Sequence, residues 1–142
     1  MDRLSLKIEK NSEGFENVHL YINGENLIEL IKRIELEYDA SIAGDYQGLP
    51  PAFVFSPSNH FFGKAQEELD YLEDKTVILL CECGIAGCWD FNVKIVFPDN
   101  TVTWSDFEQP HRGPKSAGGH WQYSSLGPFV FDRKQYESVF KK

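Results

Sequence analysis

Three cysteines lie close together in the sequence. Cys81, Cys83 and Cys88 fall within eight residues, and the chain has no other cysteine. Thiolate sulfur is a strong ligand for zinc, and a tight turn with cysteines at its edges is a common way to present two or three ligands to one ion. His111 or His120 could complete the set if their loop returns to this turn. One interpretation of the cluster is therefore a bound zinc ion or a reaction that uses the thiols.

The same cysteines have a simpler interpretation. Reduced cysteine is among the residue types most often buried, where it packs like a small hydrophobic side chain. The spacing Cys-x-Cys-x4-Cys differs from the Cys-x2-Cys pairs of many zinc sites, and no second pair of cysteines follows. The sequence therefore favours packing without a cofactor, and zinc binding and thiol chemistry are the alternatives.

The elements that flank the cysteines decide whether the three thiols can meet. Residues 76–80 form a short apolar run rich in β-branched side chains, which is typical of a strand buried on both faces. Residues 89–97 alternate between apolar and polar side chains, which indicates a second strand. Gly84 and Gly87 bracket the connection and favour a tight hairpin. On such a hairpin the first two cysteines point to one face, and the third joins them if the register allows.

The remaining patterns predict an α+β domain that spans residues 1–142. Alternation with a period of two indicates strands, and apolar residues spaced three and four apart indicate helices. We expect further strands at 4–8, 18–22, 52–55, 102–104, 120–123 and 128–131, and helices at 25–38, at about 62–72 and at 132–140, the last opened by a capping box at Asp132 and Gln135. The sequence therefore predicts an antiparallel sheet of about five to seven strands with two or three helices packed on one side.

Three aromatic residues are candidates for binding a ligand or a protein. Trp121 and Tyr123 follow a glycine-rich segment, and Tyr46 lies in a loop rich in glycine and proline. Tryptophan and tyrosine often anchor interfaces, because they combine a large apolar surface with a polar group. We expect Trp121 to be partly exposed, whereas Trp89 and Trp104 fall on the packed face of their strands. The loop around Tyr46 is most simply a connector between two elements, and the alternative is a lid over a binding site.

A second group of polar residues could act as an acid or a base. Asp106, Glu108 and His111 lie close in sequence, with Arg112 and His120 nearby. A carboxylate that orients a histidine makes a general base. No serine or cysteine nucleophile accompanies them in a recognisable arrangement, and polar residues are ordinary in an exposed loop. The sequence therefore assigns no catalytic residue and favours a protein without catalysis.

The charge of the chain limits its binding partners. The net charge is −8, and residues 1–71 carry thirteen acids and six bases. Phosphate backbones require clustered lysine and arginine, so the composition argues against nucleic acid. An acidic surface suits solubility or a basic protein partner. No segment approaches the length of a membrane span and the first residues lack the apolar region of a signal peptide, so we expect a cytoplasmic protein with reduced thiols and no membrane contact.

The second half of the chain resembles a group of uncharacterised bacterial proteins. The resemblance covers about residues 77–140 and lies in three segments, Cys81-x-Cys83-Gly84-x-x-Gly87-Cys88-Trp89, Val102-x-Trp104-x-x-Phe107-x-x-Pro110 and Gly127-Pro128-Phe129-x-Phe131-Asp132-x-x-Gln135-Tyr136. It implies a bacterial, intracellular origin. It implies no activity and no catalytic or binding residue.

Charge, motifs and resemblance together favour a small acidic cytoplasmic protein that binds another macromolecule without catalysis, as accessory and inhibitory proteins do. The alternative is a zinc-binding or thiol-dependent enzyme or sensor that uses Cys81, Cys83 and Cys88. The first needs no cofactor, whereas the second holds one zinc ion. The positions of the three sulfur atoms discriminate between them.

Overall fold

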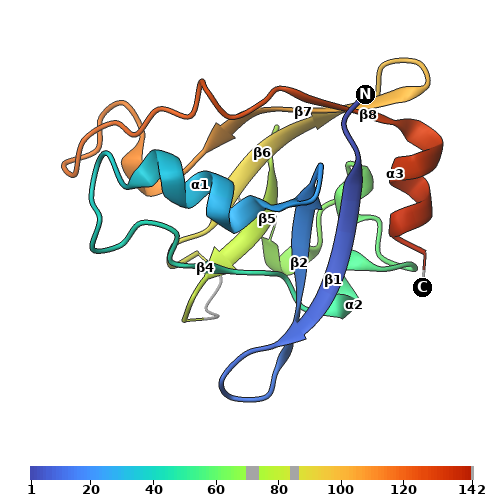
Figure 1. Cartoon of the computed structure of the whole chain (residues 1–142), viewed down its shortest axis with the longest axis horizontal. Coiled ribbons are helices and arrows are strands. Elements are labelled where there is room, and N and C mark those ends of the chain that lie inside the picture. The colour runs from blue at the N-terminus through green and yellow to red at the C-terminus, as the bar shows by residue number, and fades with distance from the viewer. Residues whose placement is uncertain (70–73, 84–86, 142) are drawn as a thin grey trace.

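The fold is an α+β arrangement of antiparallel strands and short helices (Figure 1). The structure is a computed structural model that describes residues 1–69, 74–83 and 87–141. Its strands are β1 (Leu4–Lys10), β2 (Glu16–Ile22), β3 (Glu25–Asn26), β4 (Tyr46–Gln47), β5 (Thr76–Cys81), β6 (Phe91–Val96), β7 (Thr101–Glu108) and β8 (Phe129–Asp132). Its helices are α1 (Leu27–Glu35), α2 (Pro51–Val54) and α3 (Arg133–Val139), with 3-10 turns η1 (His60–Phe62), η2 (Glu67–Leu69) and η3 (Pro110–Arg112). The predicted fold class is confirmed.

The strands divide between two sheets. β1, β2 and β3 form one sheet in that order and β4 to β8 form the other, with neighbouring strands antiparallel. The chain after β4 joins the sheets, because the Val18 N–H in β2 donates to the Leu49 carbonyl oxygen at 2.8 Å. Pro50 and Pro51 follow and cannot extend the pairing, since proline has no N–H. A second bridge joins the residue before β1 to β8, where the Asp2 N–H donates to the Val130 carbonyl oxygen at 2.9 Å.

Gly48 allows the close approach at the bridge between Val18 and Leu49. A Cβ atom at this position would lie 1.9 Å from the Val18 carbonyl oxygen, which is far shorter than any real contact. The Gly48 N–H also donates to Oδ1 of the buried Asn17 at 3.1 Å. The two sheets therefore meet at a position where a side chain does not fit.

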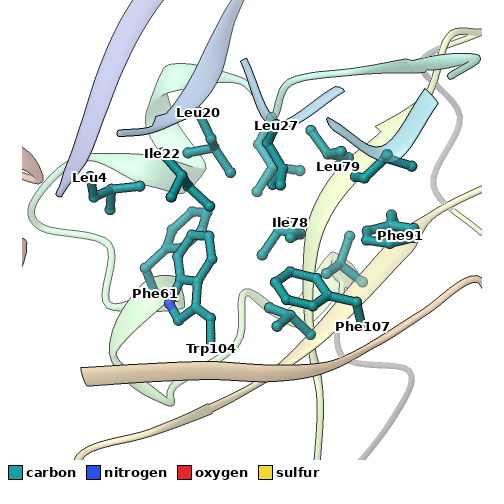
Figure 2. Packing of buried hydrophobic residues seen from close by; sticks show 14 of the residues in the cluster. Leu4, Leu20, Ile22, Leu27, Phe61, Ile78, Leu79, Phe91, Trp104 and Phe107 are labelled. Atoms are coloured by element: carbon teal, nitrogen blue, oxygen red, sulfur yellow. The ribbon is translucent and has the colours of Figure 1, made fainter. Parts of the chain in front are cut away.

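A single hydrophobic cluster extends over both sheets, and Figure 2 shows part of it. The fully buried Trp104 stacks on Phe61 with ring centroids 6.0 Å apart and meets Phe131 edge-on at 5.3 Å. Tyr136 in α3 joins these rings, because its hydroxyl donates to the Phe61 carbonyl oxygen at 2.7 Å and accepts from Trp104 Nε1 at 3.3 Å. The predicted core position of Trp104 is confirmed.

Three predicted elements are wrong. Residues 120–123 are not a strand, because the chain there runs outside both sheets and packs its aromatic rings into the core. Residues 52–55 are not a strand, because Pro51 begins the short helix α2, where its fixed φ suits the first helical position. The helix predicted from about residue 62 is replaced by η1 and η2. Gly63 ends η1 in the left-handed region with φ +86°, which stops a longer helix. Residues 70–73, where that helix is predicted to end, lie outside the described residues.

The other helices follow the prediction with changes at their ends. α1 begins after its N-cap Asn26 and ends at Glu35, three residues before the predicted end. Asp132 caps α3 as predicted and accepts the Gln135 N–H at 3.0 Å, but the Gln135 amide bonds the backbone of Leu4 instead of returning to the cap. None of the helices in the described part of the chain combines the length and the apolar character that crossing a membrane requires.

Replacement of Tyr136 by phenylalanine should destabilise the protein. The variant keeps the ring but leaves the Phe61 carbonyl oxygen and Trp104 Nε1 without this hydroxyl, and such a loss costs about 1–3 kcal/mol. Urea unfolding followed by tryptophan fluorescence measures the change. The control Tyr21→Phe, at a half-buried position of β2, should alter the free energy of unfolding by less than about 0.5 kcal/mol. Equal stability of Tyr136→Phe and the wild type would contradict the assigned role.

Candidate functional site

β5 and β6 bring the two ends of the cysteine segment together. They pair antiparallel, as the sequence predicts. Cys81 is the last residue of β5, whereas Cys83 and Cys88 lie in the connection to β6. The predicted turn residue Gly84 lies outside the described residues, and Gly87 has the φ of +83° that favours glycine. The second strand begins after the cysteines, so its alternation starts two residues later than predicted.

The three sulfur atoms form a compact cluster. The Sγ atoms of Cys81, Cys83 and Cys88 all lie within 4.8 Å of one another. The Cys83 N–H donates to Cys81 Sγ at 3.4 Å, so the backbone turns around the first sulfur. Cys81 is half-buried and the other two cysteines are exposed. Core packing does not account for this arrangement, because two of the three thiols reach solvent.

The surroundings of Cys81 favour its protonated form. Burial raises the pKa of the Cys81 thiol to about 12, and the neighbouring thiols add to this shift, whereas the Cys83 N–H opposes it. A thiol held protonated is a weak nucleophile, because the thiolate is the reactive form. A bound metal ion reverses this preference, since a coordinating thiol loses its proton. The cluster is therefore better suited to holding a metal ion than to nucleophilic attack.

Two side chains hold the peptide that precedes Cys88. Asp90 Oδ2 accepts the Gly87 N–H at 2.8 Å, and His111 Nε2 lies 3.1 Å from the Gly87 carbonyl oxygen. A carbonyl oxygen only accepts, so His111 donates through Nε2 in this contact. These bonds fix the segment that carries Cys88, as groups around metal ligands commonly do.

Asp90 is a buried carboxyl group with one unsatisfied oxygen. It is 3% exposed, and burial raises its pKa, whereas the Gly87 N–H, His111 and the Cys81 backbone N–H act in the opposite direction. Oδ1 has no hydrogen-bond partner among the described residues. Buried carboxyl oxygens normally have one. An acceptor without a donor therefore lies beside the cysteine loop.

The two predicted histidine ligands do not join the cluster. Within the described ranges, the three cysteines alone form a group whose ligand atoms lie within 4.8 Å of one another. His111 reaches the loop, but its ring stacks on Trp89 at 5.7 Å with planes 7° apart, and its Nε2 faces Gly87. His120 lines a separate groove of about 640 Å³. The structure therefore brings together three of the five predicted ligands, because the loop carries its histidines to other contacts.

The groove that contains His120 also contains most of the predicted acid–base group. Asp106, Glu108 and Arg112 line it, but His111 faces the cysteine loop instead. Glu108 is paired with Lys75 at 2.6 Å. Glu108 and His111 also line a shared hollow of about 520 Å³, but the hydrogen bonds of His111 run to Gln109 and Gly87 and not to a carboxylate.

Arg112 is a residue of the cysteine region that the sequence analysis did not assign to it. Its guanidinium lies between Trp89 and Trp121, 4.7 and 5.2 Å from their ring centroids. Nη1 donates to the His111 carbonyl oxygen at 2.8 Å. Arginine suits such stacking, because its planar cation is weakly hydrated. One sequence signal could have drawn attention to it, since residues 109–131 contain no acid.

The three aromatic residues predicted to bind a partner are buried. Trp121 and Tyr123 are each 5% exposed, and Tyr46 is 6% exposed. Trp121 stacks on Tyr38 at 5.6 Å and meets Trp89 edge-on at 5.8 Å. The prediction that Trp121 is partly exposed is therefore wrong, because rings from distant parts of the chain cover it. All three residues belong to the core.

Tyr46 and Tyr123 converge on a buried carboxylate. Both hydroxyls donate to Glu35 Oε2 at 2.6 Å, and the Gly44 N–H donates to Oε1 at 2.9 Å. Gln109 Nε2 donates to the Tyr46 hydroxyl at 3.1 Å. Burial raises the pKa of Glu35 despite these hydrogen bonds, and it also raises the pKa of both tyrosines. The tyrosines therefore remain donors to Glu35.

Replacement of Glu35 by glutamine should change how stability depends on pH. A raised pKa in the folded state means that Glu35 favours folding below its unfolded pKa, and this contribution is lost as the pH rises through the folded pKa. The wild type should therefore lose stability relative to Glu35→Gln as the pH rises above about 4.5, by about 1.4 kcal/mol for each unit of pKa shift. Urea unfolding at several pH values measures the difference.

The control for this experiment is Glu29→Gln, which removes an exposed acid from the same helix. Its stability relative to the wild type should vary little over the same pH range. A difference between Glu35→Gln and the wild type that stays constant with pH would show that the carboxyl group titrates alike in the folded and unfolded states.

Comparisons of the chain with protein-family models, with curated proteins and with solved structures find no match. The resemblance of its second half to a group of bacterial proteins stays a prediction. The chemistry of the site therefore rests on the residues that form it.

Proposed function

We propose that the protein binds one zinc ion, or a similar thiophilic divalent cation, through Cys81, Cys83 and Cys88. The proposal rests on the separation of the three sulfur atoms, which lie within 4.8 Å of one another. Tetrahedral zinc with Zn–S bonds of about 2.3 Å places its sulfur ligands about 3.8 Å apart. Small rotations of the cysteine side chains therefore suffice to close the site around an ion.

The type of ligand decides the type of metal. Thiolates favour zinc and other thiophilic ions, whereas magnesium and calcium prefer oxygen ligands. The metal would also stabilise the loop, because it would join the end of β5 to the segment before β6. A reducing setting such as the cytoplasm keeps the thiols available, and this localisation is part of the proposal.

A second proposed function is the binding of a basic protein segment. A groove of about 340 Å³ lies beside Cys83 and is lined by Glu13, Glu16 and Glu82, with no lysine, arginine or histidine in its lining. Phe15 in the same groove is 67% exposed. Carboxylates next to an exposed aromatic ring attract the cationic side chains of a partner. This surface supports the accessory role that the acidic composition predicts.

Zinc should bind in a ratio of about one ion to one chain and should need the cysteines. Protein prepared without chelators is titrated with zinc against a chromophoric chelator, and Cys83→Ser or Cys88→Ser should weaken binding by at least about tenfold, because each removes a ligand. His120→Ala is the matched control and should bind zinc like the wild type, since His120 lines the other groove. Absence of bound zinc, or an equal loss in His120→Ala, would refute the site.

A lysine-rich peptide should bind the acidic groove with an affinity that falls as salt is added. Glu13→Gln combined with Glu82→Gln removes two charges from the lining and should weaken binding, as measured by fluorescence anisotropy. Glu67→Gln with Glu68→Gln removes two exposed charges elsewhere and controls for net charge. Equal weakening in both double variants would show that the peptide responds only to overall charge.

A further inference from the structure

β1 is the outermost strand of its sheet, and part of its outer edge has no partner among the described residues. It pairs with β2 on one side only, whereas β2 also pairs with β3 (Figure 1). In an antiparallel pair, successive residues direct their backbone groups alternately toward the partner strand and away from it. The outer edge of β1 therefore presents the N–H and carbonyl groups of every second residue.

Hydrogen bonds at both ends of the β1–β2 hairpin show which residues face outward. The Asn11 N–H donates to the Phe15 carbonyl oxygen at 2.9 Å, and the Asn23 N–H donates to the Arg3 carbonyl oxygen at 2.8 Å. Both bonds join residues of odd number, and the register keeps odd residues of β1 opposite odd residues of β2. The backbone groups of the even residues of β1 therefore face outward.

Other parts of the chain cover the start of this edge and leave the rest open. The Asp2 N–H donates to the Val130 carbonyl oxygen at 2.9 Å. The Leu4 N–H donates to Gln135 Oε1 at 3.1 Å, and Gln135 Nε2 donates to the Leu4 carbonyl oxygen at 2.6 Å. The outward backbone groups that follow have no hydrogen-bond partner in the described part of the chain, and they belong to Leu6, Ile8 and Lys10. An open edge of this kind is a template for another strand.

We propose that this edge binds the same edge of a second copy of the chain, with the two β1 strands antiparallel about a two-fold axis at Ile8. The inference goes beyond the two proposed functions and does not depend on them. In this register Ile8 lies opposite Ile8 of the second copy, and Leu6 lies opposite Lys10. Each outward residue then donates one hydrogen bond and accepts another. The side chain of Ile8, which is 37% exposed, would be covered by its counterpart.

The charges of β1 favour this register over its alternatives. Lys7 and Glu9 flank Ile8, so the two-fold pairing places Lys7 of each chain opposite Glu9 of the other. An antiparallel pairing centred on Lys7 or on Glu9 would bring like charges together, and so would a parallel pairing in register. Opposite charges on facing residues stabilise a strand pair, whereas like charges destabilise it. Within one chain the Lys7 and Glu9 side chains are 65% and 38% exposed and lie 3.9 Å apart, so they can exchange partners.

The length of the open edge also fits a second β1 strand. β1 ends at Lys10, and the chain then turns back toward β2, which begins at Glu16. The strand of the second copy therefore ends beside Leu6. It turns away before it reaches Leu4, whose backbone already bonds the Gln135 side chain. The open edge and the strand that would cover it thus span the same residues, 6–10.

Sedimentation equilibrium of the full chain tests the pairing. A short strand pair buries little surface and binds weakly, so the protein concentration should extend to about 1 mM. A reducing agent and a chelator keep the exposed cysteines from linking two chains. The wild type should shift from monomer to dimer without larger species, because a two-fold contact closes on itself. A wild type that stays monomeric over the whole range would overturn the inference.

Ile8→Pro tests the backbone contact. Proline removes the central N–H of the proposed pairing, but this N–H faces away from β2, so the hairpin keeps its own hydrogen bonds. The variant should remain monomeric over the same concentrations, and circular dichroism verifies that it is folded. A folded Ile8→Pro variant that dimerises like the wild type would place the contact elsewhere and overturn the inference.

Two charge variants test the register without altering the backbone. Lys7→Glu and Glu9→Lys each place like charges across the axis, so each alone should dimerise at least about fivefold more weakly than the wild type. An equimolar mixture should regain dimers, because in the mixed pair every acid faces a base. Lys64→Glu changes an exposed charge elsewhere and should dimerise like the wild type. Equal weakening in Lys64→Glu, or a mixture that associates no better than its components, would contradict the two-fold pairing at Ile8.

Discussion

The antiparallel pairing of β5 with β6 is the constraint on which the cysteine cluster depends. β5 ends at Cys81, and the return of the chain to β6 keeps Cys88 near the same end of the sheet. A register shift of one residue would turn every side chain of a strand to its other face and would separate the thiols. On the other side of β5, Tyr46 of β4 lies opposite Cys81. The same strand end therefore positions both the thiol cluster and the buried Glu35 cluster.

The two buried carboxyl groups near this strand end differ in how many of their oxygen atoms accept hydrogen bonds. Burial raises the pKa of both Glu35 and Asp90. Glu35 accepts hydrogen bonds at both oxygens, whereas Asp90 accepts one from Gly87 and leaves Oδ1 unpaired. A fully satisfied buried network makes a structure rigid, while an unsatisfied buried oxygen carries a free-energy cost. The hydrogen bonds of the fold therefore satisfy Glu35 fully, whereas Asp90 keeps one unpaired oxygen.

Helices and strands with a periodic sequence pattern could be predicted from the sequence, whereas contacts between distant segments could not. Alternation identified β1, β6 and β7, a continuous apolar run identified β5, and the apolar spacing of three and four residues identified α1. The helix predicted from about residue 62 was wrong because Gly63 ends η1. Hydrophobic periodicity carries no information about such a stop in the backbone.

The residues of the candidate site show the same difference between local and distant contacts. Cys81, Cys83 and Cys88 are close in sequence, so a hairpin was enough to predict that they meet. The burial of Trp121 depends on Tyr38 and Trp89, which are far from it in the chain. Glu35 follows the buried Ile31 by four residues on the inner stripe of α1, and this spacing is the one signal that it would be buried.

Gln109 connects the Glu35 cluster to the cysteine loop. Its Nε2 donates to the Tyr46 hydroxyl at 3.1 Å, and its Oε1 accepts the His111 N–H at 3.1 Å. His111 in turn contacts the Gly87 carbonyl oxygen, next to Cys88. Arg112, whose guanidinium stacks on Trp89, comes from the same segment 109–131, which contains no acid. Gln109 therefore links the buried Glu35 cluster to the segment that carries Cys88, although it lies outside the cysteine loop.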